Sequence, residues 1–239
     1  MDPPRALEEA RVSVLPPARF FPPAEHASAE GLIGIGGELT TDWLLDAYRH
    51  GIFPWPQGKV LAWWSPDPRA VIELDGLHVS RRLARTCRGD RFQATRNRDF
   101  HGVIEGCRTT GSRRRGTWIT TAMVRAYLEL HRLGHAHSVE VWHEGTLAGG
   151  AYGVSVGGMF AAESMFYRVR DASKAALVHL VGHLRSRQFT LLDIQQFTPH
   201  TARLGAREIA RHEFLARLAG ALESPATFGP CLEPQRINE

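Results

Sequence analysis

The sequence predicts an α+β or mixed α/β fold, with a small N-terminal domain ahead of a larger one. Its second half alternates a helix, three strands joined by tight turns, a helix and a further strand, which is typical of helices packed on a sheet. A stretch rich in tryptophan and proline interrupts the chain near residue 68, and we place a domain boundary there. The 239 residues are 43% hydrophobic, which is enough for one large domain or two small ones.

The proposed N-terminal domain covers residues 1–68. Its first segment is rich in proline and alanine and is expected to wrap a surface. Helix signals begin at Thr40, apolar residues then recur on one face, and Gly51 lies where a helix-ending glycine is expected. The tryptophans and prolines of residues 51–68 exclude a regular helix and indicate an aromatic loop region.

The proposed second domain covers residues 69–239 and contains the remaining elements. Strands are predicted over residues 70–74, 137–142, 147–156, 159–166 and 189–194, with tight turns at 143–146 and 157–158. Helices are predicted over residues 80–88, 120–134, 172–187 and 212–222, with a short helix capped by Thr198. Ser80 and either Thr120 or Thr121 are the expected N-caps of the first two helices.

Composition narrows the class of protein. The net charge of +4 and the pI near 9.3 are compatible with an anionic partner but do not require one. No run of about 18 apolar residues exists, and the N-terminus lacks the apolar core of a signal peptide, so no membrane segment is expected. Cys87, Cys107 and Cys231 are far apart and show no metal-binding spacing, which fits a reduced, cytoplasmic protein without a metal.

Three short motifs resemble sites but lack the surroundings that those sites need. Residues 153–157 match G-x-S-x-G, yet another strand follows where a nucleophilic serine needs a helix, so we interpret Ser155 as a strand residue. Residues 31–37 are glycine-rich without the Lys-Ser/Thr of a phosphate loop, which favours a turn with positive φ. His135 and His137 share a strand face without a visible third ligand, so a structural role is favoured over metal binding.

A short basic helix is the first candidate binding surface. Arg81, Arg85 and Arg88 recur at helical spacing and form one stripe, with Arg82 beside it and no acidic residue in the helix. A solvated helix face and a contact to nucleic-acid phosphates explain this stripe equally well on its own. A second basic cluster, residues 113–115, lies in a glycine-flanked loop and could also meet phosphate.

The tryptophans provide flat faces for unpaired bases, which stack on aromatic rings for about 1–3 kcal/mol each. The rings considered are Trp55, Trp63, Trp64 and Trp118. For any single ring, a place in a tryptophan-rich core between the domains is the favoured interpretation. For the group, we expect at least one ring to meet a base.

The run Leu192-Asp193-Ile194-Gln195 is the candidate catalytic strand end. In a strand, Leu192 and Ile194 share one face, whereas Asp193 and Gln195 share the other. Two polar groups at the end of a strand beside a loop are typical of an active site. A polar strand end that bonds to its loop explains the same pattern nearly as well.

Several runs, taken together and in order, resemble the leucyl/phenylalanyl-tRNA–protein transferase family. They are GLIGIGG (31–37), GIFPW (51–55), WWSPDPR (63–69), GTWIT (116–120), GHAHSVEVW (134–142), ESMF (163–166), ASK (172–174) and LGA (204–206). Long runs in the family's order are far more specific than any single motif. The resemblance implies a small N-terminal domain followed by an acetyltransferase-like (GNAT) domain.

The resemblance also implies a reaction and its partners. Leucine or phenylalanine would move from aminoacyl-tRNA to proteins that begin with Arg or Lys, marking them for degradation by the N-degron pathway. No metal or cofactor would be needed, because the charged tRNA is the activated donor. We also expect some methionine transfer, since one methylene is worth only about 1–3 kcal/mol in an apolar pocket. An acetyl-CoA-dependent N-acetyltransferase, a related transferase for acidic acceptors and a non-catalytic tRNA-binding module are the alternatives.

The resemblance assigns the tRNA-binding and pocket residues by position. Trp55 and Trp118 would hold the terminal adenosine, and the tRNA-contacting stripe would be Arg81, Arg85 and Arg88, with Gly89 at the family's fourth basic position. The pocket for the donor side chain would be lined by Ala151, Phe160, Leu177, Leu184 and Leu192. Ala151 stands where relatives carry a bulkier methionine, which could deepen the pocket and change the preference between leucine and phenylalanine.

The polar active-site set implied by the resemblance is Glu163, Asp193 and Gln195. The family's Asp-Cys-Gln reads Asp-Ile-Gln here, so Ile194 shows that no thiol is required between the two. An aminoacyl ester is already activated, and positioning of the acceptor amine can supply much of the acceleration. We expect Gln195 to orient the amine through its side-chain oxygen, Asp193 to polarise Gln195 or take the proton through water, and Glu163 to bind an amino group or the acceptor's cationic side chain.

Overall fold

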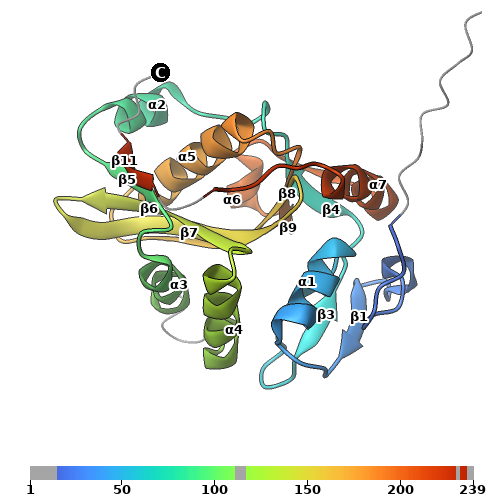
Figure 1. Ribbon diagram of the computed structural model, residues 1–239. Helices are drawn as coiled ribbons and strands as arrows, with labels where there is room; N and C mark the ends of the chain where they lie inside the picture. The colour runs from blue at the N-terminus through green and yellow to red at the C-terminus, as the bar shows by residue number, and fades with distance from the viewer. Residues whose placement is uncertain (1–14, 111–116, 230–231, 236–239) are drawn as a thin grey trace, which may run out of the picture.

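The computed structural model describes residues 15–110, 117–229 and 232–235, with side chains described as far as residue 229. Two sheets divide the chain (Figure 1). The N-terminal part contains η1 (Ala24–His26), β1 (Leu32–Ile35), α1 (Thr41–Arg49), β2 (Phe53–Pro54) and β3 (Ala62–Trp64). Its antiparallel sheet has the order β1-β3-β2. The proposed boundary at residue 68 falls between β3 and the first strand of the larger sheet, and we retain it as a proposal.

The larger part is built on an eight-stranded mixed sheet with the order β10-β4-β9-β8-β7-β6-β5-β11. Its strands are β4 (Arg69–Ile72), β5 (Gln93–Arg96), β6 (Ala136–His143), β7 (Thr146–Val156), β8 (Met159–Tyr167), β9 (Leu191–Gln195), β10 (Ala206–Ile209) and β11 (Leu232–Gln235). Its helices are α2 (Arg81–Arg88), α3 (Phe100–Thr109), α4 (Thr121–Arg132), α5 (Ala172–Ser186), α6 (Pro199–Ala202) and α7 (Arg211–Leu222). The predicted α+β class with a small N-terminal unit is therefore confirmed.

Helices cover both faces of the large sheet. In Figure 1, α2 and α5 lie above the sheet, and α3 and α4 lie below it. One hydrophobic core fills the α5 side, and a second core joins α3, α4, α1 and the lower face. Because α1 contacts α4 and β7, the N-terminal unit extends the lower layer rather than standing apart. Within the described residues, no helix has the length and apolarity needed to cross a membrane.

Local signals in the sequence placed most of the longer elements correctly. Thr40, Ser80 and Thr120 each cap a helix, since each side chain accepts a hydrogen bond from the backbone N–H three residues later. Ser155 lies inside β7, and β7 and β8 form the predicted hairpin, so the interpretation of Ser155 as a strand residue is confirmed. The glycine-rich run, residues 31–37, contains β1, flanked by three glycines with positive φ.

Several elements were not predicted, and all but one of them are short strands. They are the short strands β1, β2, β3, β5, β10 and β11, and the helix α3. Short strands carry too few residues for a periodic pattern, so they are fixed by pairing with neighbours. Strand β9 also begins at Leu191 and reaches Gln195, two residues later and one residue further than predicted. Residues 113–115 and Cys231 lie outside the described residues.

Candidate active site

The cavity lies where strands β8 and β9 separate. These parallel neighbours pair from Met159↔Leu191 to Ala161↔Asp193, after which β8 continues beside β7 and β9 ends at Gln195. A cavity of about 460 Å³ occupies this opening. The topology therefore brings the two faces of the sheet into one space, and side chains from both reach it.

The wall of the cavity toward α5 is largely apolar, with Ser173 as a polar residue from that helix. Ala151 on β7 and Ala162 on β8 contribute small side chains, and Leu177 and Leu180 reach it from α5. Ile194 closes this wall from the end of β9. Small residues on the sheet opposite leucines on the helix leave room for one apolar group, which is the environment expected for a leucine or phenylalanine side chain.

The structure brings two of the five predicted pocket residues, Ala151 and Leu177, to this wall. The other three are at most 1% exposed and lie in the core on the α5 side rather than along the cavity: Phe160, Leu184 and Leu192. The reason is their position, because Phe160 and Leu192 are still paired with each other before the strands separate. Ile194 and Leu180 line the wall instead.

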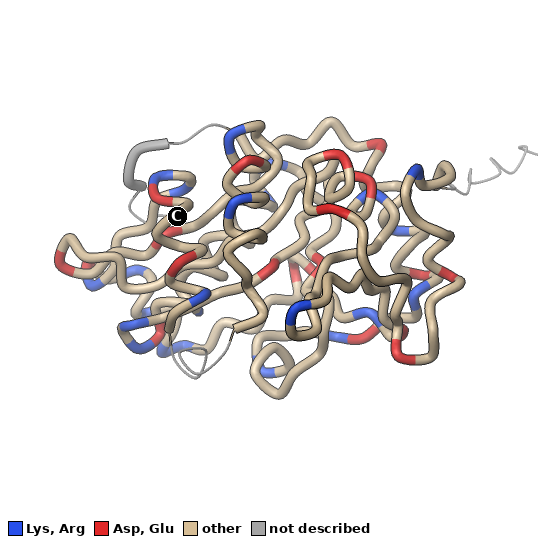
Figure 2. The backbone as a smooth tube through the Cα atoms, turned by 90° about the horizontal axis from the view of Figure 1, so that it is seen from below, with Lys and Arg blue, Asp and Glu red and all other residues tan. Residues whose placement is uncertain are grey.

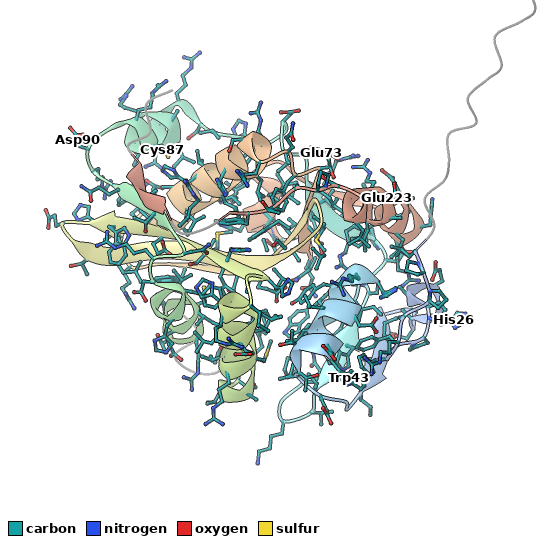
Figure 3. All side chains as sticks on the ribbon, viewed as in Figure 1. His26, Trp43, Glu73, Cys87, Asp90 and Glu223 are labelled. Carbon is teal, nitrogen blue, oxygen red and sulfur yellow. The ribbon has the colours of Figure 1, made fainter. Side chains whose placement is uncertain are left out.

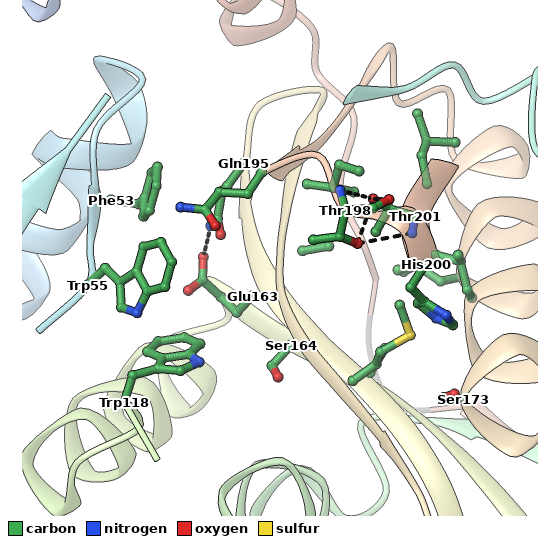
Figure 4. A pocket seen from close by; sticks show the side chains of 18 of the residues that line it. Phe53, Trp55, Trp118, Glu163, Ser164, Ser173, Gln195, Thr198, His200 and Thr201 are labelled. Carbon is green, nitrogen blue, oxygen red and sulfur yellow. Dashed lines mark hydrogen bonds between the residues drawn. The ribbon is translucent and has the colours of Figure 1, made fainter. Parts of the chain in front are cut away.

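Aromatic side chains form the opposite end of the cavity (Figure 4). Phe53 and Trp55 come from the N-terminal unit, and Trp118 precedes α4. The rings of Trp55 and Trp118 lie 6.4 Å apart at an interplanar angle of 67°, so they meet edge to face. Trp63, in contrast, is 2% exposed and packs against Trp43, which makes it a core residue.

Glu163 on β8 is the carboxyl group of the cavity. It is 7% exposed; the Tyr127 hydroxyl donates to its Oε2 at 3.0 Å and the Gln195 Nε2 donates to its Oε1 at 2.6 Å. The Tyr48 hydroxyl lies 2.5 Å from that of Tyr127 and extends the network to α1. Burial raises the pKa of Glu163 to about 7, and the hydrogen bonds from the tyrosines and Gln195 offset part of this effect. A carboxyl group with a pKa near neutral pH is suited to accept a proton.

Gln195 lies in a strained turn at the end of β9. Its φ is 64°, and the Gln196 N–H donates to the Ile194 carbonyl at 2.6 Å, which closes a γ-turn around it. A non-glycine residue in such a conformation costs of order 1–3 kcal/mol and persists where the surroundings hold it. Because its Nε2 donates to Glu163, the side-chain oxygen of Gln195 is left as an acceptor beside the cavity.

Asp193 does not line the cavity. It is 1% exposed, and its two oxygens accept from Arg69 Nε at 2.9 Å and Nη2 at 2.7 Å. Its Oδ1 also accepts from the Gln195 backbone N–H at 2.8 Å. This geometry corrects the expectation that Asp193 takes the proton or polarises the Gln195 amide, because its contact is with the Gln195 backbone and its charge is matched by Arg69.

The basic stripe on α2 is exposed as predicted. Several side chains of α2, the helix that carries the labelled Cys87, extend outward in Figure 3, and Arg81, Arg85 and Arg88 are all exposed, whereas Cys87 itself is buried. Arg82 differs, because its guanidinium donates to Asp171 Oδ2 at 2.5 Å and Oδ1 at 3.1 Å. Acidic residues are interspersed with basic ones over much of the backbone (Figure 2), so a stripe without acids is a local feature.

Sequence reasoning missed three residues of the site. Tyr48 and Tyr127 lie in helices that the sequence predicts, but their hydroxyl partners depend on how α1 and α4 meet. Arg69 is 1% exposed, although arginine is among the residues least often buried. Its place at the start of the first strand after the WWSPDP run was the available signal, but its partner Asp193 is 124 residues away. For His135 and His137, no metal-binding group is found among the described residues, and His137 contacts Asn97 at 3.0 Å.

The fold and the site together define a class of protein: a mixed sheet covered by helices, with a largely apolar cavity beside a buried carboxyl–amide pair. Comparisons with known proteins narrow this class. The family model described as "Leucyl/phenylalanyl-tRNA protein transferase" matches residues 71–219, and the model of that family's N-terminal domain matches residues 37–67.

Similar proteins of the same name cover most of the chain. The protein from Chromohalobacter salexigens is 51% identical over 87% of this chain and 82% of its own length. The protein from Pseudomonas aeruginosa strain PAO1 is 51% identical over 87% of this chain and 93% of its own length. The protein from Nitratidesulfovibrio vulgaris is 48% identical over 94% of this chain and 97% of its own. The chain belongs to the leucyl/phenylalanyl-tRNA protein transferase family.

Solved structures show a more distant likeness. A GCN5-related N-acetyltransferase from Kribbella flavida aligns with a TM-score of 0.39 and 10% identity over 70% of this chain and 60% of its own. A GCN5-related N-acetyltransferase-like protein from Streptococcus suis aligns with a TM-score of 0.34 and 15% identity over 71% of this chain and 65% of its own. The α+β class rests on the sheet and helices described above.

Proposed function

We propose that this chain transfers leucine or phenylalanine from aminoacyl-tRNA to the N-terminal amine of proteins that begin with Arg or Lys, marking them for degradation. The observation that carries the proposal is the Gln195–Glu163 pair, which lies between an aromatic wall and an apolar pocket. The aromatic wall suits the terminal adenosine, and the pocket suits the donor side chain. The pair then lies where the ester carbonyl and the attacking amine would meet.

The chemistry assigns different tasks to the two side chains. The side-chain oxygen of Gln195 accepts a hydrogen bond from the acceptor amine and directs its lone pair to the ester carbonyl carbon. As the new amide bond forms, Glu163 takes the amine proton, for which its raised pKa is suited. The ester C–O bond then breaks, and Glu163 returns this proton to the departing ribose oxygen, which leaves as a hydroxyl. Asp193 acts in this scheme by holding the Gln195 backbone.

The remaining assignments follow from the same reaction. Trp55 and Trp118 contact the adenosine, and the three exposed arginines of α2 contact tRNA phosphates, where each neutralised phosphate adds salt-dependent affinity. Methionine is a further donor, because an apolar wall discriminates weakly among unbranched and branched side chains of this size. The reaction needs no metal or cofactor, because the ester supplies the driving force, and it takes place in the cytoplasm with charged tRNA.

The test supplies tRNA charged with labelled leucine together with peptides that begin with Arg, Asp or Ala. The label is expected to move to the Arg peptide alone, and ribonuclease treatment is expected to abolish the transfer. Label on the Asp peptide instead would identify a transferase for acidic acceptors. Transfer of acetyl groups from acetyl-CoA that survives ribonuclease would identify an N-acetyltransferase and refute the proposal.

A further inference from the structure

Arg69 is a fully buried cation between the two parts of the chain. It opens β4, and its Nη1 donates to the carbonyl of Gly51, which follows α1 in the N-terminal unit, at 2.9 Å. Its guanidinium lies 4.8 Å from the ring centre of Phe53 and 4.4 Å from that of Phe214. The two rings and the carbonyl leave the guanidinium a single orientation, which presents Nε and Nη2 to Asp193.

The contacts continue from Arg69 to the reacting side chain. Both oxygens of Asp193 are held by Arg69, and Oδ1 also accepts the Gln195 N–H. That hydrogen bond holds the backbone N–H of Gln195, the central residue of the γ-turn, which has a φ of 64°. With this φ, Gln195 leaves the regular strand conformation, so the direction of its side chain is set by the turn and not by the alternation of side chains along β9.

We propose that Arg69 is a positioning residue of the transfer reaction, which acts by holding Asp193 so that the turn at Gln195 aims its amide at Glu163. The inference rests on the proposed function of Gln195. Arg69 itself touches neither substrate, because it does not line the cavity. Its effect on catalysis therefore passes through Gln195. An effect of this kind can be distinguished experimentally from a contribution of Arg69 to folding alone.

The test is a double-mutant cycle on leucine transfer to a peptide that begins with Arg. The variants are Arg69→Met, Gln195→Ala and the combination of both, with kcat and KM for charged tRNA measured for each. Each single change is expected to lower kcat by about tenfold or more with little change in KM. The combination is expected to be no slower than Gln195→Ala by more than about threefold, because Arg69 has no other route to the chemistry.

Two further variants keep the test decisive if Arg69→Met folds poorly. Arg69→Lys retains a buried cation but cannot form the two-pronged contact with Asp193, so it should fold and still lower kcat, and it enters the same cycle. Arg217→Met is the matched control, since it removes an arginine paired with Glu73 and Glu213 away from the cavity, and it should leave kcat unchanged.

The outcomes distinguish a wrong role for Arg69 from a wrong role for Gln195. If losses from the Arg69 and Gln195 changes multiply, or if Arg69→Lys transfers as fast as the unmodified chain, Arg69 is structural and the inference is wrong. If Gln195→Ala alone leaves transfer unchanged, the proposed function of Gln195 fails first. If Gln195→Ala lowers kcat but the Arg69 variants do not, the inference is wrong and the proposed function stands.

Discussion

Replacing Glu163 by glutamine should remove the contribution of this carboxyl group to the pH dependence of stability near neutral pH. Burial raises the pKa of the folded carboxyl to about 7, against 4.5 for an unburied glutamate. Between these two values the folded chain holds a proton at Glu163 that the unfolded chain has released. The free energy of unfolding therefore falls as the pH rises through this window, and the stabilisation is lost above pH 7.

The size of the effect follows from the pKa values. One pKa unit corresponds to about 1.4 kcal/mol, so the difference between 4.5 and 7 corresponds to about 3 kcal/mol. A glutamine has no charge to desolvate at any pH. Relative to the unmodified chain, Glu163→Gln should gain about 3 kcal/mol in the free energy of unfolding on going from pH 4.5 to pH 8.

The same substitution should abolish most of the transfer activity. Glutamine can accept from the Tyr127 hydroxyl only through its single oxygen, which leaves its NH₂ group facing Gln195. The Gln195 amide must then rotate to present its oxygen to this NH₂ group. The side-chain oxygen of Gln195 is then no longer available to accept a hydrogen bond from the acceptor amine. With the proton acceptor also removed, we expect a loss of about 10²-fold or more in kcat.

Urea unfolding of both chains at several pH values from 4.5 to 8.5 measures the first effect, and single-turnover transfer measures the second. Glu129→Gln is the control, because Arg132 lowers the pKa of Glu129, so both its folded and unfolded pKa values lie at or below the start of this range and the stability difference should stay nearly constant above it. A difference between Glu163→Gln and the unmodified chain that is constant across this range would refute the reasoning about burial.

Three further predictions address the pocket, the arginine stripe and the buried ion pair. Ala151→Met should narrow the apolar wall and lower phenylalanine transfer by about tenfold relative to leucine, as measured with the two charged tRNAs in competition. Replacing Arg81, Arg85 and Arg88 by alanine should raise KM for charged tRNA and reduce its dependence on salt, with kcat unchanged at saturation. Asp193→Ala should destabilise the fold by about 3–5 kcal/mol in urea unfolding, because it leaves a buried guanidinium unpaired.

The features that the sequence predicted correctly depend on interactions between residues close together in the chain. Helix caps such as Ser80 and hairpin turns such as residues 157–158 involve residues that are only a few positions apart, so a short stretch of sequence is enough to predict them. The pocket was predicted less well. Its wall depends on the point at which β8 and β9 separate, and strand alternation alone could not show that Leu192 lies before this point and Ile194 beyond it.

The sequence by itself determined the family, the α+β class, the exposed arginine stripe and the identities of Glu163 and Gln195 as polar residues of the site. These properties depend on residue types, local spacing and ordered motifs. The tertiary structure alone decided what each polar group does. It paired Asp193 with Arg69 across 124 residues and joined Glu163 to tyrosines on two different helices. A buried ionisable group is governed by its neighbours in space. Asp193 therefore supports the Gln195 backbone, and burial raises the pKa of Glu163 to about 7 although its hydrogen bonds lower it.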